Sequence, residues 1–193
     1  MEDDSNFIET SSQKKKRVAI ALITIGVILV IAIASALLVR EFVLTTFIVD
    51  GPSMYPTLDG GGSALDDGEV LILNKLDTPN RGDIIVFNYD WGQEAGFEPH
   101  ALVKRVIGVG GDKIKFENNE LYVNGIKLTE DYINGEMYTP DAEYTVPSGC
   151  YFVLGDNRNN SNDSRMIGSV PKDKVLGVCV LVVGTDKSLR IPD

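Results

Sequence analysis

An uninterrupted apolar run near the N-terminus places the strongest constraint on how this chain can fold. Residues 18–39 (VAIALITIGVILVIAIASALLV) contain no charged residue and no proline. At ~1.5 Å per residue, a helix of roughly 22 residues crosses the ~30 Å hydrocarbon core of a bilayer. The run therefore predicts one transmembrane helix at 18–39, with a tail at 1–17 before it and a separate domain at 40–193 after it.

The charged residues on either side of this run predict its orientation. A basic cluster at 14–17 (KKKR) precedes it, whereas only Arg40 follows it, next to Glu41. Basic flanks remain on the cytoplasmic side of a membrane. The tail is therefore predicted to be cytoplasmic and residues 40–193 extracytoplasmic, in a single-pass protein of the cell membrane.

A cleaved signal peptide is the alternative interpretation of the same run. Ala32, Ala34 and Ala36 offer small-x-small patterns near its end. However, the run exceeds the usual ~7–15-residue apolar region of a signal peptide, and an acidic stretch at 2–4 opens the chain. These two features favour an anchor.

The formal net charge of −10 belongs to the outer domain, because the acidic and basic residues of the tail cancel. An acidic outer domain argues against a nucleic-acid partner. It also gives no attraction to anionic lipid headgroups. Contact with membrane lipid beyond the anchor would therefore have to be apolar.

From residue 40 onward, short runs rich in Val, Ile, Phe and Tyr alternate with Gly, Asn, Asp and Pro. These runs are FVLTTFIV, EVLILNKL, DIIVFNY, LVKRVIGV, KIKFE, ELYVNG, YTV, CYFVLG and KVLGVCVLVV. Such runs, bounded by turn residues, predict a mainly β domain. Asn124-Gly125 predicts a hairpin turn and Asn134-Gly135 a second turn. Stretches 59–68 and 93–99 are predicted to be loops without catalytic residues.

The cysteines and the single histidine indicate little metal chemistry. Cys150 and Cys179 each stand in an apolar, strand-like run, which favours two small buried residues, although a disulfide is allowed outside the membrane. The chain has no C-x-x-C pair, and His100 is its only histidine. No structural zinc site and no cofactor are therefore predicted.

Ser53 is the best candidate for a nucleophile. It directly follows an extended apolar run, and Gly51, Pro52 and Pro56 restrict the backbone on both sides of it. Such a turn can hold a serine hydroxyl and its own amide N–H toward a substrate. The alternative is an ordinary turn serine.

A nucleophilic serine needs a base, and Lys104 fits this role better than His100. If LVKRVI is a strand, Leu102, Lys104 and Val106 share one face and Arg105 faces the other way. Desolvation between aliphatic side chains lowers the pKa of a lysine toward neutrality. The alternative is a lysine at a sheet edge whose amine reaches solvent.

A polar segment at 155–165 (GDNRNNSNDSR) follows the apolar run CYFVL, and Asp163 and Arg165 within it could pair. Its small polar residues favour a loop held by side-chain-to-backbone hydrogen bonds. A calcium loop is the alternative, but the spacing and terminal Glu of an EF-hand are missing.

Together these stretches resemble bacterial type I signal peptidases, most closely the short Gram-positive form with one anchor helix. The matching segments are, in the family's order, the apolar helix, PSMYPTL at 52–58, RGDIIVF at 81–87, KRVIG at 104–108 running on to 111–112, and the segment 155–165. The resemblance implies a β-sheet or barrel catalytic domain of the signal-peptidase type. It also implies a membrane-bound endopeptidase whose substrates are secretory preproteins, cleaved after small-x-small (A-x-A) sites.

By this resemblance, Ser53 is the nucleophile and Lys104 its general base. Ser161 would orient the amine of Lys104, and Asp163 and Arg165 would form a supporting salt bridge. The Ser53 amide N–H would supply part of the oxyanion hole. Matching positions also suggest walls for the substrate pocket, namely Phe47, Val49, Met54, Leu58 and Val103.

Three positions depart from the family's pattern. Gly51 stands where many members have a serine that helps to hold the oxyanion, as is usual in Gram-positive enzymes. Gly110 replaces a proline, and Met166-Ile167 replaces an aromatic pair. These differences affect the expected local shape rather than the assignment of nucleophile and base.

Three other functions are alternatives. A self-cleaving Ser-Lys repressor would carry a DNA-binding head rather than the span at 18–39. A signal peptidase of the endoplasmic-reticulum or archaeal type would have a histidine base where Lys104 stands. A membrane-tethered binding module would make Ser53 and Lys104 ordinary surface residues.

Overall fold

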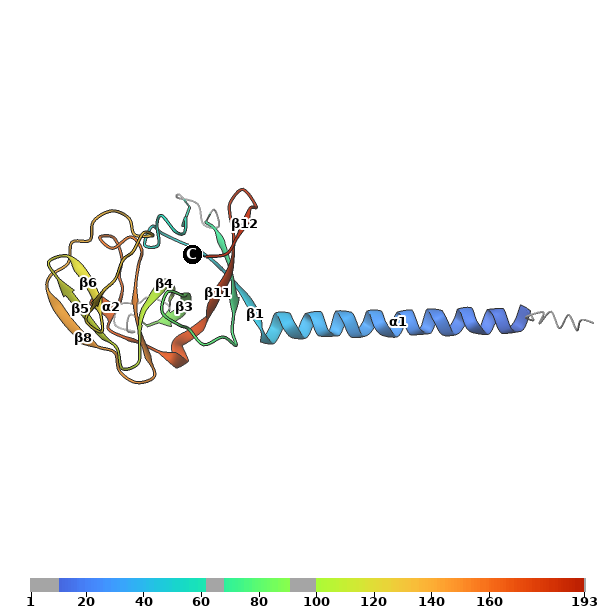
Figure 1. The fold of residues 1–193 in the computed structure, drawn as a ribbon. Helices are drawn as coiled ribbons and strands as arrows, with labels where there is room; N and C mark the ends of the chain where they lie inside the picture. The colour runs from blue at the N-terminus through green and yellow to red at the C-terminus, as the bar shows by residue number, and fades with distance from the viewer. Residues whose placement is uncertain (1–10, 62–67, 91–99, 193) are drawn as a thin grey trace, which may run out of the picture. The chain divides into compact units, whose positions relative to one another are not determined.

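The computed structural model describes residues 11–61, 68–90 and 100–192 and divides after Phe42 into two compact units (Figure 1). The first is the helix α1 (Ser11–Phe42), and the second begins at Val43. Residues 62–67 and 91–99, which hold most of the two predicted loops, lie outside the described residues.

Helix α1 contains the predicted span and extends beyond it at both ends. Its candidate membrane span, Gln13–Val39, contains an apolar window with a mean hydropathy of 3.0, and none of that window is buried within the protein. The helix begins before residue 18 because the basic cluster at 14–17 consists of good helix formers. A long helix that is apolar on every side is typical of a membrane span.

The larger of two antiparallel sheets carries the candidate residues. Its strand order is β1-β2-β11-β3-β4-β9-β10, with β12 paired to β11. The strands are β1 (Leu44–Ile48), β2 (Val70–Asn74), β3 (Ile84–Tyr89), β4 (His100–Val109), β9 (Cys150–Leu154), β10 (Val170–Pro171), β11 (Val175–Val183) and β12 (Leu189–Arg190). Among the described residues, β1 and β10 are the two end strands, so these pairings do not close the sheet into a barrel.

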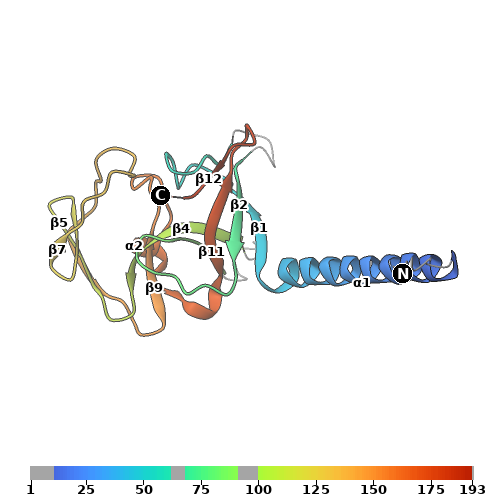
Figure 2. The same ribbon diagram turned by 45° about the vertical axis from the view of Figure 1, so that its right-hand side comes forward.

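A four-stranded sheet, β7-β6-β5-β8, follows β4 in the chain (Figure 2). It comprises β5 (Lys113–Glu117), β6 (Glu120–Val123), β7 (Ile126–Lys127) and β8 (Ala142–Thr145). Asn124 and Gly125 join β6 to β7 with φ angles of 53° and 80°. Positive φ at both positions is what a tight hairpin turn requires, so the predicted turn is confirmed.

Both faces of the larger sheet are covered. Four consecutive residues of β3, from Ile84 to Phe87, are buried, as are Tyr151 to Leu154 in β9. Ile84 and Val86 belong to one apolar cluster and Ile85 and Phe87 to another. Strands buried on both faces are continuously apolar, as these two are.

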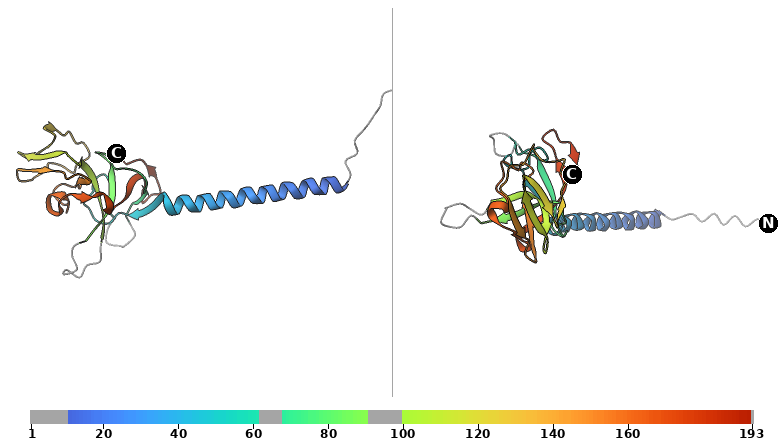
Figure 3. Two further views of the ribbon diagram at one scale, coloured as in Figure 1. Left: turned by 90° about the horizontal axis from the view of Figure 1, so that it is seen from below. Right: turned by 60° about the vertical axis from the view of Figure 1, so that its left-hand side comes forward.

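A third apolar cluster joins the two sheets. Phe152 and Leu154 of β9 pack with Ile114 and Phe116 of β5. Phe116 and Phe152 have ring centroids 6.3 Å apart, within the range of aromatic pairs. The smaller sheet is therefore fixed against the strand that precedes the polar segment 155–165 (Figure 3).

The mainly β prediction is confirmed, and each predicted run contains a strand. The one-turn helix α2 (Ser164–Ile167), the 3-10 turn η2 (Lys172–Lys174) and the two-residue strands β10 and β12 were not predicted, whereas β7 follows the predicted hairpin turn. Elements this short carry too little periodicity to be recognised.

Candidate active site

Ser53 lies in a turn just after β1, and buried apolar residues of this turn anchor it in the core. Met54 and Leu58 are fully buried, and the Leu58 N–H donates to the Met54 carbonyl at 2.9 Å. Gly51 has φ +81°, a conformation that disfavours any residue with a Cβ. The turn therefore has a fixed backbone while Ser53 remains partly accessible.

Two glycines of the stretch 59–68, which was predicted to be a loop without catalytic residues, approach the backbone just before Ser53. A Cβ on Gly60 would lie 2.1 Å from the Gly51 carbonyl oxygen. A Cβ on Gly68 would lie 1.9 Å from the Val49 carbonyl oxygen. Both glycines are thus needed for close backbone approach just before Ser53, a role that the spacing of glycines alone does not reveal.

Lys104 lies within reach of Ser53. Its side chain is almost completely buried in β4, and Nζ donates to Ser53 Oγ at 2.7 Å. A second hydrogen bond, 2.8 Å long, joins Nζ to the carbonyl of Val103. The structure thus brings together the two residues that the sequence analysis singled out.

Burial lowers the pKa of Lys104 to about 8, because desolvation penalises its ammonium form. The negative charges of Asp163 and Asp156 act in the opposite direction but do not cancel this effect. A substantial fraction of the amine is therefore neutral slightly above neutral pH. A neutral amine at hydrogen-bond distance can accept a hydroxyl proton.

Arg105, on the opposite face of β4, is buried to the same degree as Lys104 but has a matched counter-charge. Its guanidinium donates to both oxygens of the Asp156 carboxylate, at 2.9 and 2.7 Å, and to the Gly82 carbonyl at 2.9 Å. It also lies over the ring of Tyr132, 3.9 Å from the centroid. Two-point pairing of this kind fixes the guanidinium in position.

Asp156 and Asn157, just after β9, hold the Ser53 turn. The backbone N–H of Asn157 donates to the Ser53 carbonyl at 3.1 Å, and its side-chain amide donates to the Pro52 carbonyl at 3.0 Å. Thr57, at the other end of the turn, donates to Asp156 at 2.5 Å. The same carboxylate pairs with Arg105, so it connects the Ser53 turn to β4.

The sequence analysis missed this clamp. It treated residues 155–165 as one polar loop and singled out only three later positions. Asp156 and Asn157 are buried, as are Arg158, Asp163 and Ser164, but they are the polar residues that come first after the buried strand β9. Polar residues at the end of a buried strand are the signal that could have found them.

Asp163 and Arg165 form an ion pair, 2.7 Å long. Asp163 also accepts a hydrogen bond from the Gly155 N–H at 3.1 Å. Arg165 donates to the hydroxyl of Thr139 at 3.1 Å and to the Arg158 carbonyl at 2.6 Å. The pair therefore ties the segment 155–165 to itself and to the residues before β8.

Ser161 packs against Gly155 rather than on the amine of Lys104. A Cβ on Gly155 would lie 2.2 Å from Ser161 Oγ and 2.5 Å from the Ser53 carbonyl oxygen. Within the described part of the chain, Ser161 Oγ is buried without a hydrogen-bond partner, and Lys104 donates to Val103 instead. The structure thus places Ser161 beside the Ser53 backbone but does not show the predicted contact with Lys104.

A cavity of about 320 Å³ adjoins the Ser53–Lys104 pair. It is lined by Phe47, Asp50, Ser53, Ala101, Leu102, Val103 and Lys104. Of the five predicted wall residues, Phe47 and Val103 line it. Val49, Met54 and Leu58 do not line it; they are buried in one apolar cluster together with Val103. The predicted role of these five residues as walls of the substrate pocket stays a prediction.

The cavity runs beside an incompletely paired strand. Residues 100–104 of β4 pair with β3, whereas β9 joins the other edge of β4 only from Arg105 onward. Within the described residues, no strand covers that edge beside Lys104. Such an edge presents backbone donors and acceptors to which an extended peptide can add.

Comparison with known proteins identifies the family. A family model described as signal peptidase, peptidase S26, matches residues 22–184. The chain belongs to this family. It is 36% identical over 188 residues to signal peptidase I of Bacillus amyloliquefaciens, covering 90% of this chain and 91% of that protein. It is 37% identical over 172 residues to signal peptidase I T of Bacillus subtilis, covering 81% and 82% of the two chains.

A crystal structure of a signal peptidase I from Enterococcus faecalis is 37% identical, covers 53% of this chain and 97% of that one, and gives a TM-score of 0.44. The family match and the curated relatives make this chain a type I signal peptidase, a serine endopeptidase that acts in signal-peptide processing. Helix α1 is compatible with the membrane anchor of such an enzyme.

The described residues hold no group of three or more His, Cys, Asp or Glu side chains arranged for a metal ion. Cys150 and Cys179 are free thiols, and burial raises the pKa of Cys179 to about 11. Cys179 therefore stays protonated near neutral pH, in keeping with its predicted role as a small buried residue.

Proposed function

We propose that this signal peptidase cleaves secreted preproteins after small-x-small sites, with Ser53 as nucleophile and Lys104 as general base. One observation carries the proposal: Nζ of a buried lysine with a lowered pKa lies 2.7 Å from the Ser53 hydroxyl. This pairing of nucleophile and base is what hydrolysis through an acyl-enzyme requires.

The reaction begins when the neutral amine of Lys104 takes the proton of the Ser53 hydroxyl. Ser53 Oγ then bonds to the scissile carbonyl carbon, and the amide N–H of Ser53 donates to the resulting oxyanion. As the C–N bond breaks, the Lys104 ammonium returns its proton to the leaving amine of the mature protein. The signal peptide remains attached to Ser53 as an ester.

Hydrolysis of this ester uses the same lysine. Neutral Lys104 removes a proton from a water molecule, and the hydroxide attacks the ester carbonyl. Collapse of this second oxyanion breaks the bond to Ser53 Oγ, which regains its proton from Lys104. The products are the free signal peptide, the mature protein and the unchanged enzyme.

The size of the cavity next to Ser53 supports selection of small side chains. Phe47, Ala101 and Val103 give the cavity an apolar lining. Its volume of about 320 Å³ must hold all the substrate side chains that enter it, which leaves little room for each. The open edge of β4 can pair with the extended substrate backbone, so that alternate side chains point into the cavity.

The anchor places enzyme and substrate on the same membrane. With the tail at 1–17 in the cytoplasm, the catalytic domain lies on the outer surface, where the end of a membrane-embedded signal peptide emerges. Tethering both partners to one surface raises their effective concentration.

The test uses the full chain, purified in mild detergent with added phospholipid, and a precursor that carries an A-x-A site. Wild type is compared with Ser53→Ala and Lys104→Ala. Ser148→Ala and Lys113→Ala, at exposed positions, are the matched controls. Cleavage after the second alanine by the wild type and both controls, but by neither active-site variant, is expected.

Two results would overturn parts of the proposal. Activity retained by Lys104→Ala would assign the base to another residue, and His100 would be replaced next. Cleavage that moves to sites with large side chains, with no preference for A-x-A, would remove the proposed specificity while leaving the Ser53–Lys104 pair intact.

A further inference from the structure

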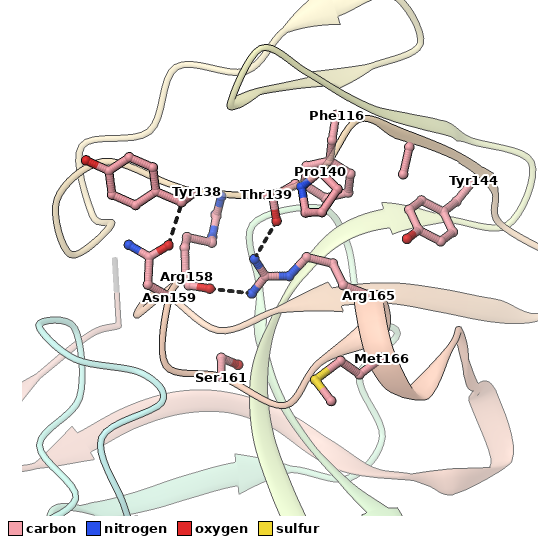
Figure 4. Close-up of a pocket in the computed structure, with 11 residues that line it drawn as sticks. Phe116, Tyr138, Thr139, Pro140, Tyr144, Arg158, Asn159, Ser161, Arg165 and Met166 are labelled. Atoms are coloured by element: carbon pink, nitrogen blue, oxygen red, sulfur yellow. Dashed lines mark hydrogen bonds between the residues drawn. The ribbon is translucent and has the colours of Figure 1, made fainter.

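A second and larger cavity, of about 590 Å³, lies between the smaller sheet and the loop after β9 (Figure 4). One wall comes from β5, β8 and the segment before β8, and the other from residues 158–166. Arg165 joins the two walls through its hydrogen bond to Thr139, and it also donates to the Arg158 carbonyl within its own wall (Figure 4).

The surface offered by this cavity is mainly apolar and aromatic. Phe116, Tyr144 and Met166 contribute to its walls, and Tyr138 lines it with 66% of its surface exposed. Met166 is 75% exposed although it is apolar. Large exposed apolar side chains around a hollow mark a surface that binds something.

The two arginines of this cavity are already neutralised. Arg165 pairs with Asp163, and Arg158 pairs with Glu130 at 2.5 Å. Neither guanidinium therefore offers an uncompensated charge to a ligand. The chemistry of the cavity favours an uncharged apolar or aromatic side chain over an acidic one.

The cavity adjoins the catalytic pair through Ser161. Ser161 lines it, and the Ser161 hydroxyl converges with the Ser53 carbonyl on one face of Gly155. Ser53 and Lys104, in turn, line the smaller cavity. The two cavities share no lining residue, but Ser161 of the larger one approaches the backbone of Ser53, which lines the smaller one.

The course of β4 places the two cavities toward different ends of this strand. Residues 101–104 of β4 border the smaller cavity, and the chain then passes Lys104 and continues into β5, which borders the larger one. In Figures 1 and 2 the smaller sheet lies across β4 from β1, which carries Phe47 of the smaller cavity.

We propose that the larger cavity binds the mature segment of the preprotein, that is, the residues that follow the scissile bond, and prefers apolar or aromatic side chains there. This inference rests on the proposed function. If the residues before the bond occupy the smaller cavity and the scissile carbonyl reaches Ser53, the chain must continue toward Ser161. There it meets this cavity.

The first experiment measures kcat/KM for peptides that share one A-x-A signal sequence and differ after the scissile bond. One peptide ends in a fluorogenic amine directly after the second alanine, and the others carry two, four or six further residues that include leucine or phenylalanine. For wild type, kcat/KM is expected to rise about tenfold along this series, the effect of burying one large apolar side chain. Aspartate at the same positions should abolish the rise.

Variants then assign the effect to the cavity. Tyr138→Ala and Met166→Ala remove exposed side chains that pack in no core. Ile126→Ala, at an exposed position of β7 that does not line the cavity, is the matched control. Both cavity variants are expected to lose the gain from the longer peptides, mainly through KM, while they cleave the truncated peptide like wild type. A melting temperature equal to that of wild type excludes unfolding.

The possible outcomes distinguish a failure of this inference from a failure of the proposed peptidase function. No cleavage of the truncated peptide by wild type would contradict the proposed function itself. Cleavage of that peptide with no gain from longer ones, or a gain that survives in both cavity variants, would overturn the inference alone. A photoreactive phenylalanine placed after the scissile bond should crosslink to residues 138–140 or 158–166 in the Ser53→Ala enzyme, and crosslinking elsewhere would also overturn it.

Discussion

Two neighbouring basic residues on opposite faces of β4 show that one strand can bury basic side chains for two different purposes. Lys104 and Arg105 are 2% and 1% exposed. Arg105 meets both oxygens of Asp156, whereas Lys104 is hydrogen-bonded to a hydroxyl and a carbonyl. Equal burial therefore yields a fixed structural ion on one face and a lysine with a lowered pKa on the other. The counter-ion, not the depth, decides which role a buried cation takes.

The largest effect should come from making the two cations alike. In Lys104→Arg the side chain stays charged at every accessible pH, so it cannot accept the Ser53 proton. We expect kcat for precursor cleavage to fall by about 10³–10⁴-fold, with little change in KM. Lys113→Arg, on the exposed face of β5, is the control. A loss of less than tenfold would contradict the role of Lys104 as base.

Removing the counter-ion of Arg105 tests whether Asp156 stabilises the buried guanidinium. Asp156→Asn leaves a buried guanidinium without its charge partner, and the expected loss of unfolding free energy is about 3–5 kcal/mol. Urea unfolding of the full chain in detergent, followed by circular dichroism, measures it. The double variant Arg105→Met, Asp156→Leu should regain much of this loss. If Asp156→Asn alone is as stable as wild type, the pair is not what holds the arginine.

The pH dependence sharpens the difference between the two cations. With a pKa of about 8 in the folded state, Lys104 should make kcat/KM rise with pH to a plateau above that value. The precursor assay, repeated at closely spaced pH values, measures this profile. A rate that kept climbing to about pH 10, near the ordinary lysine pKa, would contradict the lowered pKa.

The same pKa affects stability with a definite sign. Below pH 8 the amine is protonated in both states, and its burial makes wild type less stable than Lys104→Met. Between about 8 and the ordinary value of 10.5, only the unfolded state keeps the proton, so wild type gains stability as the pH rises. A shift of this size corresponds to about 3 kcal/mol. Urea titrations of both proteins at pH 7 and pH 10 measure the gain.

The smallest effect concerns the clamp that holds the nucleophile turn near Lys104. Asn157→Ala keeps the backbone hydrogen bond to Ser53 but removes the side-chain donor to Pro52 without adding a charge near Lys104. We expect kcat to fall by about tenfold, the value of one or two hydrogen bonds, with the apparent pKa of the pH profile unchanged. Asn160→Ala, at an exposed position of the same loop, should change kcat much less. A shifted pKa would show that Asn157 acts on Lys104 directly.

The contrast within β4 also marks how far sequence can predict such a site. Alternation along LVKRVI placed Lys104 and Arg105 on opposite faces, and the aliphatic neighbours of Lys104 indicated its burial. The partner of Arg105 lies 51 residues away, on a loop whose many Asp and Asn residues are interchangeable to a pattern-based prediction. Only the pairing of β4 with β9 brings Asp156 to it.

The substrate pocket shows a second limit of the same kind. Val49, Met54 and Leu58 have the composition expected of an apolar pocket, but the turn that presents Ser53 directs them into the core. Apolar side chains near a reactive serine either line the substrate pocket or pack in the core beneath the turn. Which of the two they do depends on the direction of the turn, and close backbone contacts such as that of Gly60 with Gly51 support that turn.

The uncovered edge of β4 has a consequence for how many different precursors one enzyme can serve. A strand edge offers only main-chain N–H and C=O groups, which are the same in every peptide. Backbone pairing of a substrate with this edge therefore does not depend on the substrate's sequence. Under the proposed function, all discrimination between cleavage sites must then reside in what the flanking cavities admit, so sequences with nothing else in common become equivalent substrates once their side chains fit.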